Sequence, residues 1–321
     1  MWAMAGRLQK RSVEALSMLA HLNDRSPAMP DATRPLALDR FRHLETLRVR
    51  WAEVDMQRIV FNGHYLMYFD TAVAGYWRAM AMPYQATMAS LGGDLYVRKA
   101  TLEYEGSARY DDQLAIGIRC ARIGNSSMLL QAAVFRGEVR LVQGELVYVF
   151  ADLTNQRALP VPPALRDLFD SFEAGEPMVS VRSGDWAALG HLARPVRDAV
   201  FIQEQGIPAA LEHDEADAAA VHAVAFNRLG IALGTGRLIK LGGGMSKIGR
   251  MAVLASVRGA GIGKPLLEAL VQAARSRGDK EVTLSAQAGA IGFYRRAGFA
   301  SQGEAFEEAG IAHQTMTLRL A

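Results

Sequence analysis

The stretch "MAVLASVRGAGIGKPLLEAL", residues 251–270, joins an apolar strand to a helix through a turn with alternating glycines. Glycine lets backbone amides approach a ligand closely, and the unpaired amides at a helix N-terminus favour an anion. The turn therefore predicts a phosphate site, with turn geometry alone as the alternative reason for its glycines. An amphipathic helix is predicted after the turn, because apolar side chains recur at helical spacing at Leu266, Leu267, Leu270, Val271 and Ala274.

Two common nucleotide-binding patterns do not fit this turn. A P-loop needs glycine where Arg258 stands and Ser or Thr where Pro265 stands. The dinucleotide spacing G-x-G-x-x-G is also absent, since the glycines alternate singly.

The order Arg258-x-x-Gly261-x-Gly263 instead resembles the coenzyme A pyrophosphate loop of the GCN5-related N-acetyltransferases, the GNAT superfamily. A second stretch, "AIGFYRRAGF" at residues 290–299, is similar to the A-I-x-x-Y-x-x-x-G-F helix and turn of that superfamily. The resemblance covers about residues 179–321. It implies a mixed α/β fold that transfers an acyl group directly from acetyl-CoA to an amine.

The resemblance also implies site residues. Tyr294 would protonate the departing thiolate, since a phenol is neutral at pH 7 and can donate; the alternative is an ordinary tyrosine on a helix face. Glu204 is the first candidate for a general base and His222 the second, and either can be structural. Coenzyme A would be bound by Met251, Ala252 and Val253 at the pantetheine arm, by Arg258, Gly259, Ala260, Gly261, Ile262, Gly263 and Lys264 at the pyrophosphate, and by Gln287, which stands where many members have Asn.

The earlier stretch "DMQRIVFNGHYLMYFD", residues 55–70, places an acid ahead of an apolar run. A carboxylate beside Ile59 and Val60 is costly to leave unpaired, so it needs a donor or a catalytic role. The helix predicted to follow has its apolar stripe at Leu66, Phe69, Val73, Trp77 and Met80. Four strand-like runs between residues 95 and 152, separated by turn signals, then predict an α+β unit with a mainly antiparallel sheet.

Asp55, Val60, Asn62 and Tyr65 lie in register with the pattern D-x-x-G-x-V-x-[NH]-x-x-Y, which this stretch resembles in hotdog-fold thioesterases of the 4-hydroxybenzoyl-CoA thioesterase type. "YDDQLAIGIRCARIGNSSM", residues 110–128, is similar to later strands of the family, and the resemblance covers about residues 43–172. It implies thioester hydrolysis, with Asp55 as base or nucleophile and backbone amides near Asn62 polarising the carbonyl.

Two substitutions depart from the family pattern. Arg58 occupies the usual glycine, and Asn62 stands where a large subgroup has His, so a different loop path or acyl group is expected. The structural alternative for Asp55 is that it caps the following turn or pairs with Arg50 or Arg58. His64 is interpreted as a helix-start residue.

Composition restricts the class of protein to which the chain can belong. The chain has 321 residues, 50% hydrophobic and 21% charged, with a net charge of +3 from mixed acids and bases, which predicts two soluble domains and argues against a nucleic-acid binder. Cys120 is the only cysteine, so a reducing cytoplasm is expected and an intrachain disulfide is excluded. No apolar run approaches the roughly 18 residues of a membrane span, and the histidines show no metal-ligand spacing.

The sequence thus predicts a flexible leader at residues 1–42, in which Met29 is an alternative start, a hotdog domain at 43–172, a linker at 173–178 and a GNAT domain at 179–321. We expect a bifunctional enzyme with acyl-CoA as co-substrate, an amine acceptor, no permanently bound cofactor, no membrane insertion, and assembly as a homodimer or homotetramer. One alternative keeps only the acetyltransferase active, with the hotdog domain binding acyl-CoA and dimerising. The other is a non-enzymatic sensor of CoA thioesters.

Overall fold

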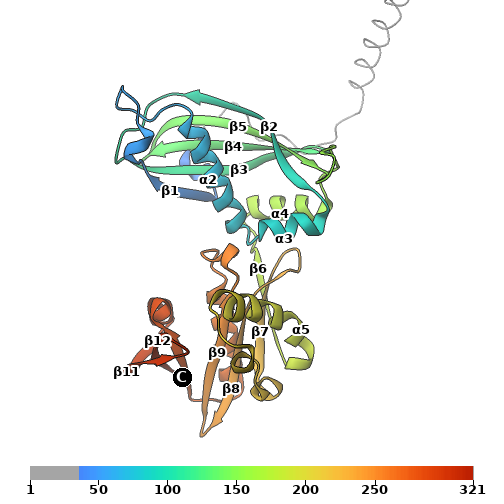
Figure 1. Ribbon diagram of the computed structural model, residues 1–321, viewed down its shortest axis with the longest axis vertical. Helices are drawn as coiled ribbons and strands as arrows, with labels where there is room; N and C mark the ends of the chain where they lie inside the picture. Colours follow the sequence, from blue (N-terminus) through green and yellow to red (C-terminus); the bar gives the residue numbers. More distant parts are fainter. Residues whose placement is uncertain (1–35, 321) are drawn as a thin grey trace, which may run out of the picture. The chain divides into compact units, whose positions relative to one another are not determined.

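The computed structural model describes residues 36–320 (Figure 1). The predicted leader therefore lies largely outside the described residues, as does Met29. No helix in the described part of the chain is long and apolar enough to cross a membrane.

The first half of the described chain forms an antiparallel five-stranded sheet in the order β1-β3-β4-β5-β2. The longest helix, α2, lies across one face of this sheet and contacts β1, β3 and β4 (Figure 1). The elements are the short turns η1 (Leu38–Arg40) and η2 (Trp51–Glu53), the strands β1 (His43–Arg48), β2 (Asp94–Tyr104), β3 (Gln113–Ile123), β4 (Ser127–Arg136) and β5 (Val139–Ala151), and the helices α2 (His64–Ala79), α3 (Tyr84–Leu91) and α4 (Pro163–Glu173).

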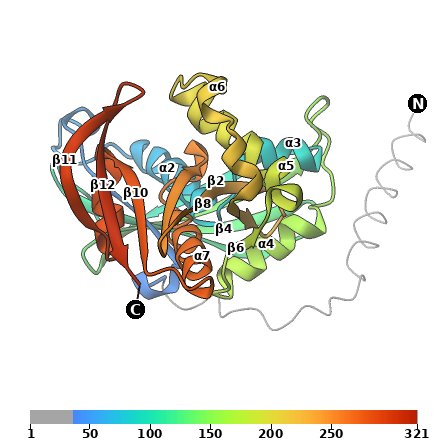
Figure 2. The ribbon, with the colours of Figure 1, turned by 90° about the horizontal axis from the view of Figure 1, so that it is seen from below.

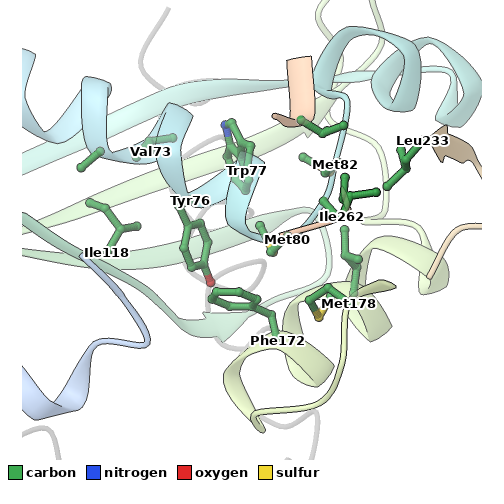
Figure 3. Packing of buried hydrophobic residues seen from close by; sticks show 14 of the residues in the cluster. Val73, Tyr76, Trp77, Met80, Met82, Ile118, Phe172, Met178, Leu233 and Ile262 are labelled. Carbon is green, nitrogen blue, oxygen red and sulfur yellow. The ribbon is translucent and has the colours of Figure 1, made fainter. Parts of the chain in front are cut away.

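The buried face of α2 differs in part from the predicted stripe. Val73, Trp77 and Met80 are buried as predicted, and the ring of Phe172 on α4 packs edge-on against Tyr76, with 5.2 Å between centroids (Figure 3). Leu66, however, is 43% exposed, so its place in the stripe was wrong. Tyrosines take the buried positions because their hydroxyls find partners inside: Tyr65 with Ala108, Tyr68 with Glu53, and Tyr76 with Glu173.

The second half forms a mixed seven-stranded sheet in the order β11-β12-β10-β9-β8-β7-β6, with the hairpin β11–β12 at one edge (Figure 2). Its strands are β6 (Val179–Gly184), β7 (Val221–Asn227), β8 (Ala232–Gly242), β9 (Met245–Val253), β10 (Glu281–Gln287), β11 (Ala300–Glu308) and β12 (Ile311–Arg319). The helices are α5 (Trp186–Arg197), the π-helical segment η3 (Asp198–Glu204), α6 (Ala209–Glu212), η4 (Glu215–Ala219), η5 (Ala255–Val257), α7 (Gly263–Ser276), η6 (Ala288–Ala290) and α8 (Ile291–Arg296).

Helices cover both faces of this sheet. Ala223 and Ala225 of β7 belong to the same buried cluster as the apolar side chains of α7. The alternate residues Val224 and Phe226 pack with Leu189 of α5 instead. Successive side chains of a strand point to opposite faces, so α5 and α7 lie on opposite sides of β7. All five predicted core positions of α7 are buried.

The two central strands of the sheet separate where the site lies. β9 and β10 pair in parallel from Met245 to Ile248, and the pairing stops there. Beyond that point β9 carries a bulge, because its residues Arg250 and Met251 face the single residue Gly236 of β8. Residues 249–253 therefore have no ladder partner on the side of β10.

The observed architecture confirms the predicted fold class, an antiparallel sheet with its helix followed by a mixed α/β unit. Residues 174–178, between α4 and β6, fall inside the predicted linker. The domain boundaries themselves stay a prediction. Cys120, on β3, is buried and unbridged.

Candidate active sites

The first candidate site is a cavity of about 560 Å³ beside the loop that precedes α2. Asp55, Asn62 and Tyr65 line it together, so the structure brings the predicted family residues to one place. The rest of its wall is mostly apolar and comes from Met56, Gln57, Ile59, Val60, Phe61, Tyr104, Gly106 and Ser107.

Asp55 is half-buried in a tight loop closed by a bridge between Val54 and Val60. One carboxylate oxygen, Oδ1, accepts the backbone amide of Gln57 at 2.8 Å, which is the turn-capping role. Neither Arg50 nor Arg58 pairs with it: Arg50 forms its ion pair with Glu53 at 2.5 Å. Oδ2 has no hydrogen-bond partner within residues 36–320, so capping leaves one oxygen available to a ligand.

Arg58 keeps the backbone conformation that glycine adopts readily. Its φ is +62°, in the left-handed region. The Arg58 amide donates to Asp55 O at 2.9 Å and closes the turn. Arg58 therefore places a side chain on a backbone conformation that is strained for any residue other than glycine.

Two backbone amides lie at the N-terminus of α2 beside this cavity. The described residues supply no acceptor for the amides of Asn62 and Gly63, whereas Phe61 and His64 donate to Glu53 O and Phe61 O. The Asn62 carbonyl accepts the Tyr104 hydroxyl at 3.2 Å. Free amides at the start of a 16-residue helix are suited to bind an oxyanion. His64 begins α2, as interpreted from the sequence.

Sequence reasoning missed a second carboxylate nearby, Glu53, which is 4% exposed. Burial alone would raise the pKa of Glu53, but hydrogen bonds from the Arg50 amide, the Tyr68 hydroxyl and the Arg50 guanidinium lower it below its usual value. All of these partners are local and fixed. Glu53 therefore anchors the loop rather than facing the cavity.

The second candidate site lies at the glycine turn. A cavity of about 980 Å³ is lined by the turn, by α7 and by α8. Gly259 and Gly261 have φ values of +89° and +78°, and no backbone acceptor for their amides exists in the described part of the chain. These amides and the N-terminus of the 14-residue helix α7 can hold a phosphate, as the sequence predicted.

Two basic residues at this cavity were not singled out from the sequence, Arg275 on α7 and Arg296 on α8. Both are helix-surface residues after the glycine turn, so a search for cations near a phosphate loop could have found them. Among the predicted ligands, Arg258, Gly259, Gly261, Ile262, Gly263, Lys264 and Val253 line this cavity.

Arg258 and Glu204 are bound to each other. The guanidinium contacts both carboxylate oxygens, at 2.6 and 2.7 Å, and each side chain is about two-fifths exposed. The Arg258 hydrogen bonds lower the pKa of Glu204, which makes it a weaker base. Glu204 as general base stays a prediction, and this ion pair counts against it.

A third cavity, of about 440 Å³, opens where β9 and β10 separate. Tyr294, Met251 and Gln287 line it, and Gln287 Nε2 donates to Gln205 Oε1 at 3.1 Å. Burial raises the pKa of Tyr294 to about 12, so its hydroxyl is protonated at neutral pH. Sequence reasoning assigned no role to His313, which lines the same cavity.

A buried charge network holds the wall of this third cavity. Arg197 is fully buried and binds Asp217 at 2.9 Å as well as Glu212, while Arg250 binds Glu212 at 2.7 Å. The ion pairs of Glu212 hold α6 in place, and Leu211 and Glu212 of α6 line the cavity.

His222 lies away from all three cavities. It is 1% exposed, and its Nε2 lies 2.9 Å from Asp217 O. Burial lowers the pKa of His222. It therefore packs in its strand, the structural alternative for this residue.

Comparison with known proteins gives two family matches in the same order. A thioesterase-like superfamily model matches residues 49–169, and an acetyltransferase (GNAT) domain model matches residues 189–320. YjcF, an uncharacterised N-acetyltransferase of Bacillus subtilis, is 37% identical over 122 residues, which are 38% of this chain and 86% of that protein. The acyl-CoA thioesterase YbgC of Haemophilus influenzae is 20% identical over 123 residues, which are 38% of this chain and 90% of that protein.

Among solved structures, the PA5185 protein of Pseudomonas aeruginosa shares 25% identity with a TM-score of 0.36, over 42% of this chain and 94% of that one. The order of the two matched regions agrees with the order of the two sheets. Residues 49–169 match the thioesterase-like superfamily model and have a hotdog-like arrangement of sheet and helix. Through residues 189–320 the chain belongs to the GNAT acetyltransferases.

Proposed function

We propose that this protein hydrolyses acyl-CoA thioesters at the Asp55 cavity and transfers an acyl group from acetyl-CoA to an amine at the Tyr294 cavity. Both families act on acyl-CoA as substrate. The free amides of Asn62 and Gly63 beside an unpartnered Asp55 oxygen carry the hydrolase proposal. The separation of β9 from β10 between the glycine turn and Tyr294 carries the transferase proposal.

In the hydrolysis, Asp55 Oδ2 takes a proton from water while the water oxygen attacks the thioester carbonyl. The amides of Asn62 and Gly63 stabilise the negative oxygen that forms. The carbon–sulfur bond then breaks, and the thiolate takes up the proton. The wall of Ile59, Phe61 and Tyr104 favours an apolar or aromatic acyl group.

In the transfer, the acyl-CoA lies with its pyrophosphate on the amides of the glycine turn. Its pantetheine arm extends along the unpaired edge of β9, with Met251, Ala252 and Val253 as ladder partners. The amine nitrogen attacks the thioester carbonyl and the carbon–sulfur bond breaks. Tyr294 gives its proton to the sulfur and is restored by the proton that the nitrogen loses.

The hydrolase is tested with Asp55→Asn. Thiol release from acetyl-CoA, hexanoyl-CoA and benzoyl-CoA without amine should fall about 100-fold or more, the usual contribution of a positioned base. Asp39→Asn, at the exposed turn η1, is the matched control and should hydrolyse as the unchanged protein does. If Asp55→Asn hydrolyses normally, Asp55 is not the catalytic carboxylate. Normal binding without any turnover would instead favour the domain as an acyl-CoA binder.

The transferase is tested with Gly261→Asp, which puts a carboxylate and a strained φ where a phosphate is proposed to lie. We expect it to abolish amine-dependent acylation and to spare hydrolysis. Gly278→Asp is the matched control, because Gly278 has a φ of +81° at the other end of α7. Loss of both activities in Gly261→Asp alone would show that the two sites do not work independently. Absence of any turnover in the unchanged protein would favour a CoA-thioester sensor.

A further inference from the structure

The cavity where β9 and β10 separate holds a second group suited to proton transfer, His313 on β12. It lines the same 440 Å³ space as Tyr294 on α8. In the sheet register His313 lies opposite Gln287 of β10 on one side and Phe306 of β11 on the other. Three strands therefore fix the backbone that carries the imidazole.

The hydrogen bond of the ring decides which nitrogen is free. His313 Nδ1 lies 2.8 Å from Ile311 O. A carbonyl oxygen only accepts, so in the neutral ring Nδ1 carries the hydrogen and Nε2 carries the lone pair. Phe306 stacks on the imidazole, with 5.9 Å between centroids and 23° between planes, and holds its orientation. Nε2 has no hydrogen-bond partner within residues 36–320.

The other charged and titratable groups at this cavity come from every element around it. Arg250 on β9 is committed to Glu212 on α6 and to Asp214, and Glu212 also binds Arg197. Lys247 on β9 carries an ammonium group, which has hydrogen-bond donors and no acceptor. Tyr294 is the proposed donor of the proton to the sulfur. Glu308 on β11 is the only other free acceptor of a proton lining the cavity in the described part of the chain, so it is the rival base.

We propose that His313 is the general base of the transferase, a role that rests on the function proposed above. The acceptor binds as an ammonium, and Nε2 takes one of its protons and passes it to solvent. The neutral nitrogen attacks the thioester carbonyl and the carbon–sulfur bond breaks. Tyr294 gives its proton to the sulfur, and the second proton lost by the nitrogen restores Tyr294. The products are an N-acylated amine, coenzyme A and one proton in solution.

The positions of the two bases predicted from the sequence support this assignment. Glu204 binds Arg258 through both carboxylate oxygens, and His222 is buried against Asp217 O outside the cavity. His313 alone among the three lines the cavity with Tyr294. The stretch "EEAGIAHQTM", residues 307–316, contains His313, but nothing in that stretch indicated a role for the histidine.

The first measurement establishes the reaction itself. Full-length protein is given acetyl-CoA with spermidine, glucosamine, the twenty amino acids or a lysine-containing peptide, and amine-dependent thiol release is recorded. If none of these amines accelerates release, the proposed transfer is overturned, and the role of His313 with it. An active amine becomes the probe for the variants.

The second measurement tests His313 itself. In His313→Gln, kcat/KM for the amine should fall about 100-fold or more near neutral pH, while KM for acetyl-CoA stays unchanged. The acid limb of the pH profile should shift to that of the free amine, because only an amine that arrives unprotonated can react. Added imidazole should restore part of the rate in His313→Ala. A purely structural histidine would give neither the shift nor the rescue.

Four further variants make the outcome decisive. His191→Gln, on the exposed surface of α5, is the matched control and should leave the profile unchanged. Tyr294→Phe should reduce kcat and keep the acid limb. If the acid limb disappears in Glu308→Gln or Glu204→Gln and persists in His313→Gln, the base is the carboxylate and the assignment to His313 is wrong.

Discussion

Arg58 shows how a single residue can carry strain in the loop that presents Asp55. A side chain in the left-handed region costs about 1–2 kcal/mol, whereas glycine there loses only about 0.5–1 kcal/mol of entropy. Arg58→Gly should therefore raise the free energy of unfolding by about 0.5–1 kcal/mol. Urea unfolding followed by tryptophan fluorescence measures this.

Arg58→Ala is the control, because alanine keeps the strain and loses the guanidinium. It should be no more stable than the unchanged protein. Equal stability of the glycine and alanine variants would mean that the positive φ of +62° is not a source of strain.

Glu53 should make the stability of the protein depend on pH. Its pKa is lowered in the folded state from the usual 4.5, so its contribution to stability is complete above 4.5 and is lost as the pH falls through the folded-state pKa. Glu53→Gln should cost about 1–3 kcal/mol at neutral pH, since it removes charge-assisted hydrogen bonds. The difference in the free energy of unfolding between Glu53→Gln and the unchanged protein should shrink once the pH falls below the unfolded-state pKa of Glu53.

Urea midpoints between pH 7 and about pH 3 test this linkage. Glu138→Gln, on the exposed turn between β4 and β5, is the control and should follow the unchanged protein at every pH. A constant difference between Glu53→Gln and the unchanged protein down to acid pH would contradict the assignment.

At the scale of elements, α6 and η4 depend on charge more than on apolar packing. The guanidinium of Arg197 is fully buried and contacts Glu212 and Asp217. Its Nη1 lies 2.9 and 3.0 Å from the two carboxylate oxygens of Asp217. Removing one partner of such a buried cluster costs up to about 3–5 kcal/mol, because Glu212 and Asp217 stay buried with only Arg250 and Arg237 as counterions. We expect this loss in Arg197→Met, and a smaller one in Arg197→Lys, whose ammonium lacks the fork.

Hydrogen exchange at residues 209–219 should rise in both variants, together with a fall in the urea midpoint. Arg194→Lys, one turn earlier on the exposed surface of α5, is the control. Unchanged exchange in Arg197→Met would show that the segment is held by packing.

The elements also show where sequence patterns succeed. The strands β2 to β5 and the helix α7 were predictable, because alternation and helical spacing survive where an element packs on one core. The stripe of α2 was only partly predictable, because hydroxyl partners decide whether a tyrosine is buried, and those partners come from distant residues. The hairpin β11–β12 was missed: its first strand is exposed along its whole length and gives no apolar alternation. His313 was missed with it.

At the scale of the molecule, large apolar side chains are exposed between residues 51 and 61, in and beside the loop of the first cavity. Met56 is fully exposed, Trp51 is 75% exposed and Phe61 is 52% exposed, and β2 is an 11-residue edge strand. Exposed apolar surface and a free strand edge favour association. We propose that a second copy of the chain covers this surface, so sedimentation should give twice 34.9 kDa or a higher multiple.

Met56→Glu should shift that mass toward the monomer, because it puts a charge into the covered surface. Leu241→Glu is the matched control, since Leu241 is 53% exposed on β8. A monomeric unchanged protein, or an equal effect of both variants, would overturn the proposed interface.

Buried Cys120 has a consequence for a protein whose two proposed reactions both release coenzyme A. Burial, reinforced by the nearby carboxylates of Glu173 and Asp170, raises the pKa of the Cys120 thiol, so the sulfur stays protonated and inert. It is the only sulfhydryl of the chain. The folded enzyme therefore offers its own product no partner for a mixed disulfide, and oxidised coenzyme A should leave its mass unchanged.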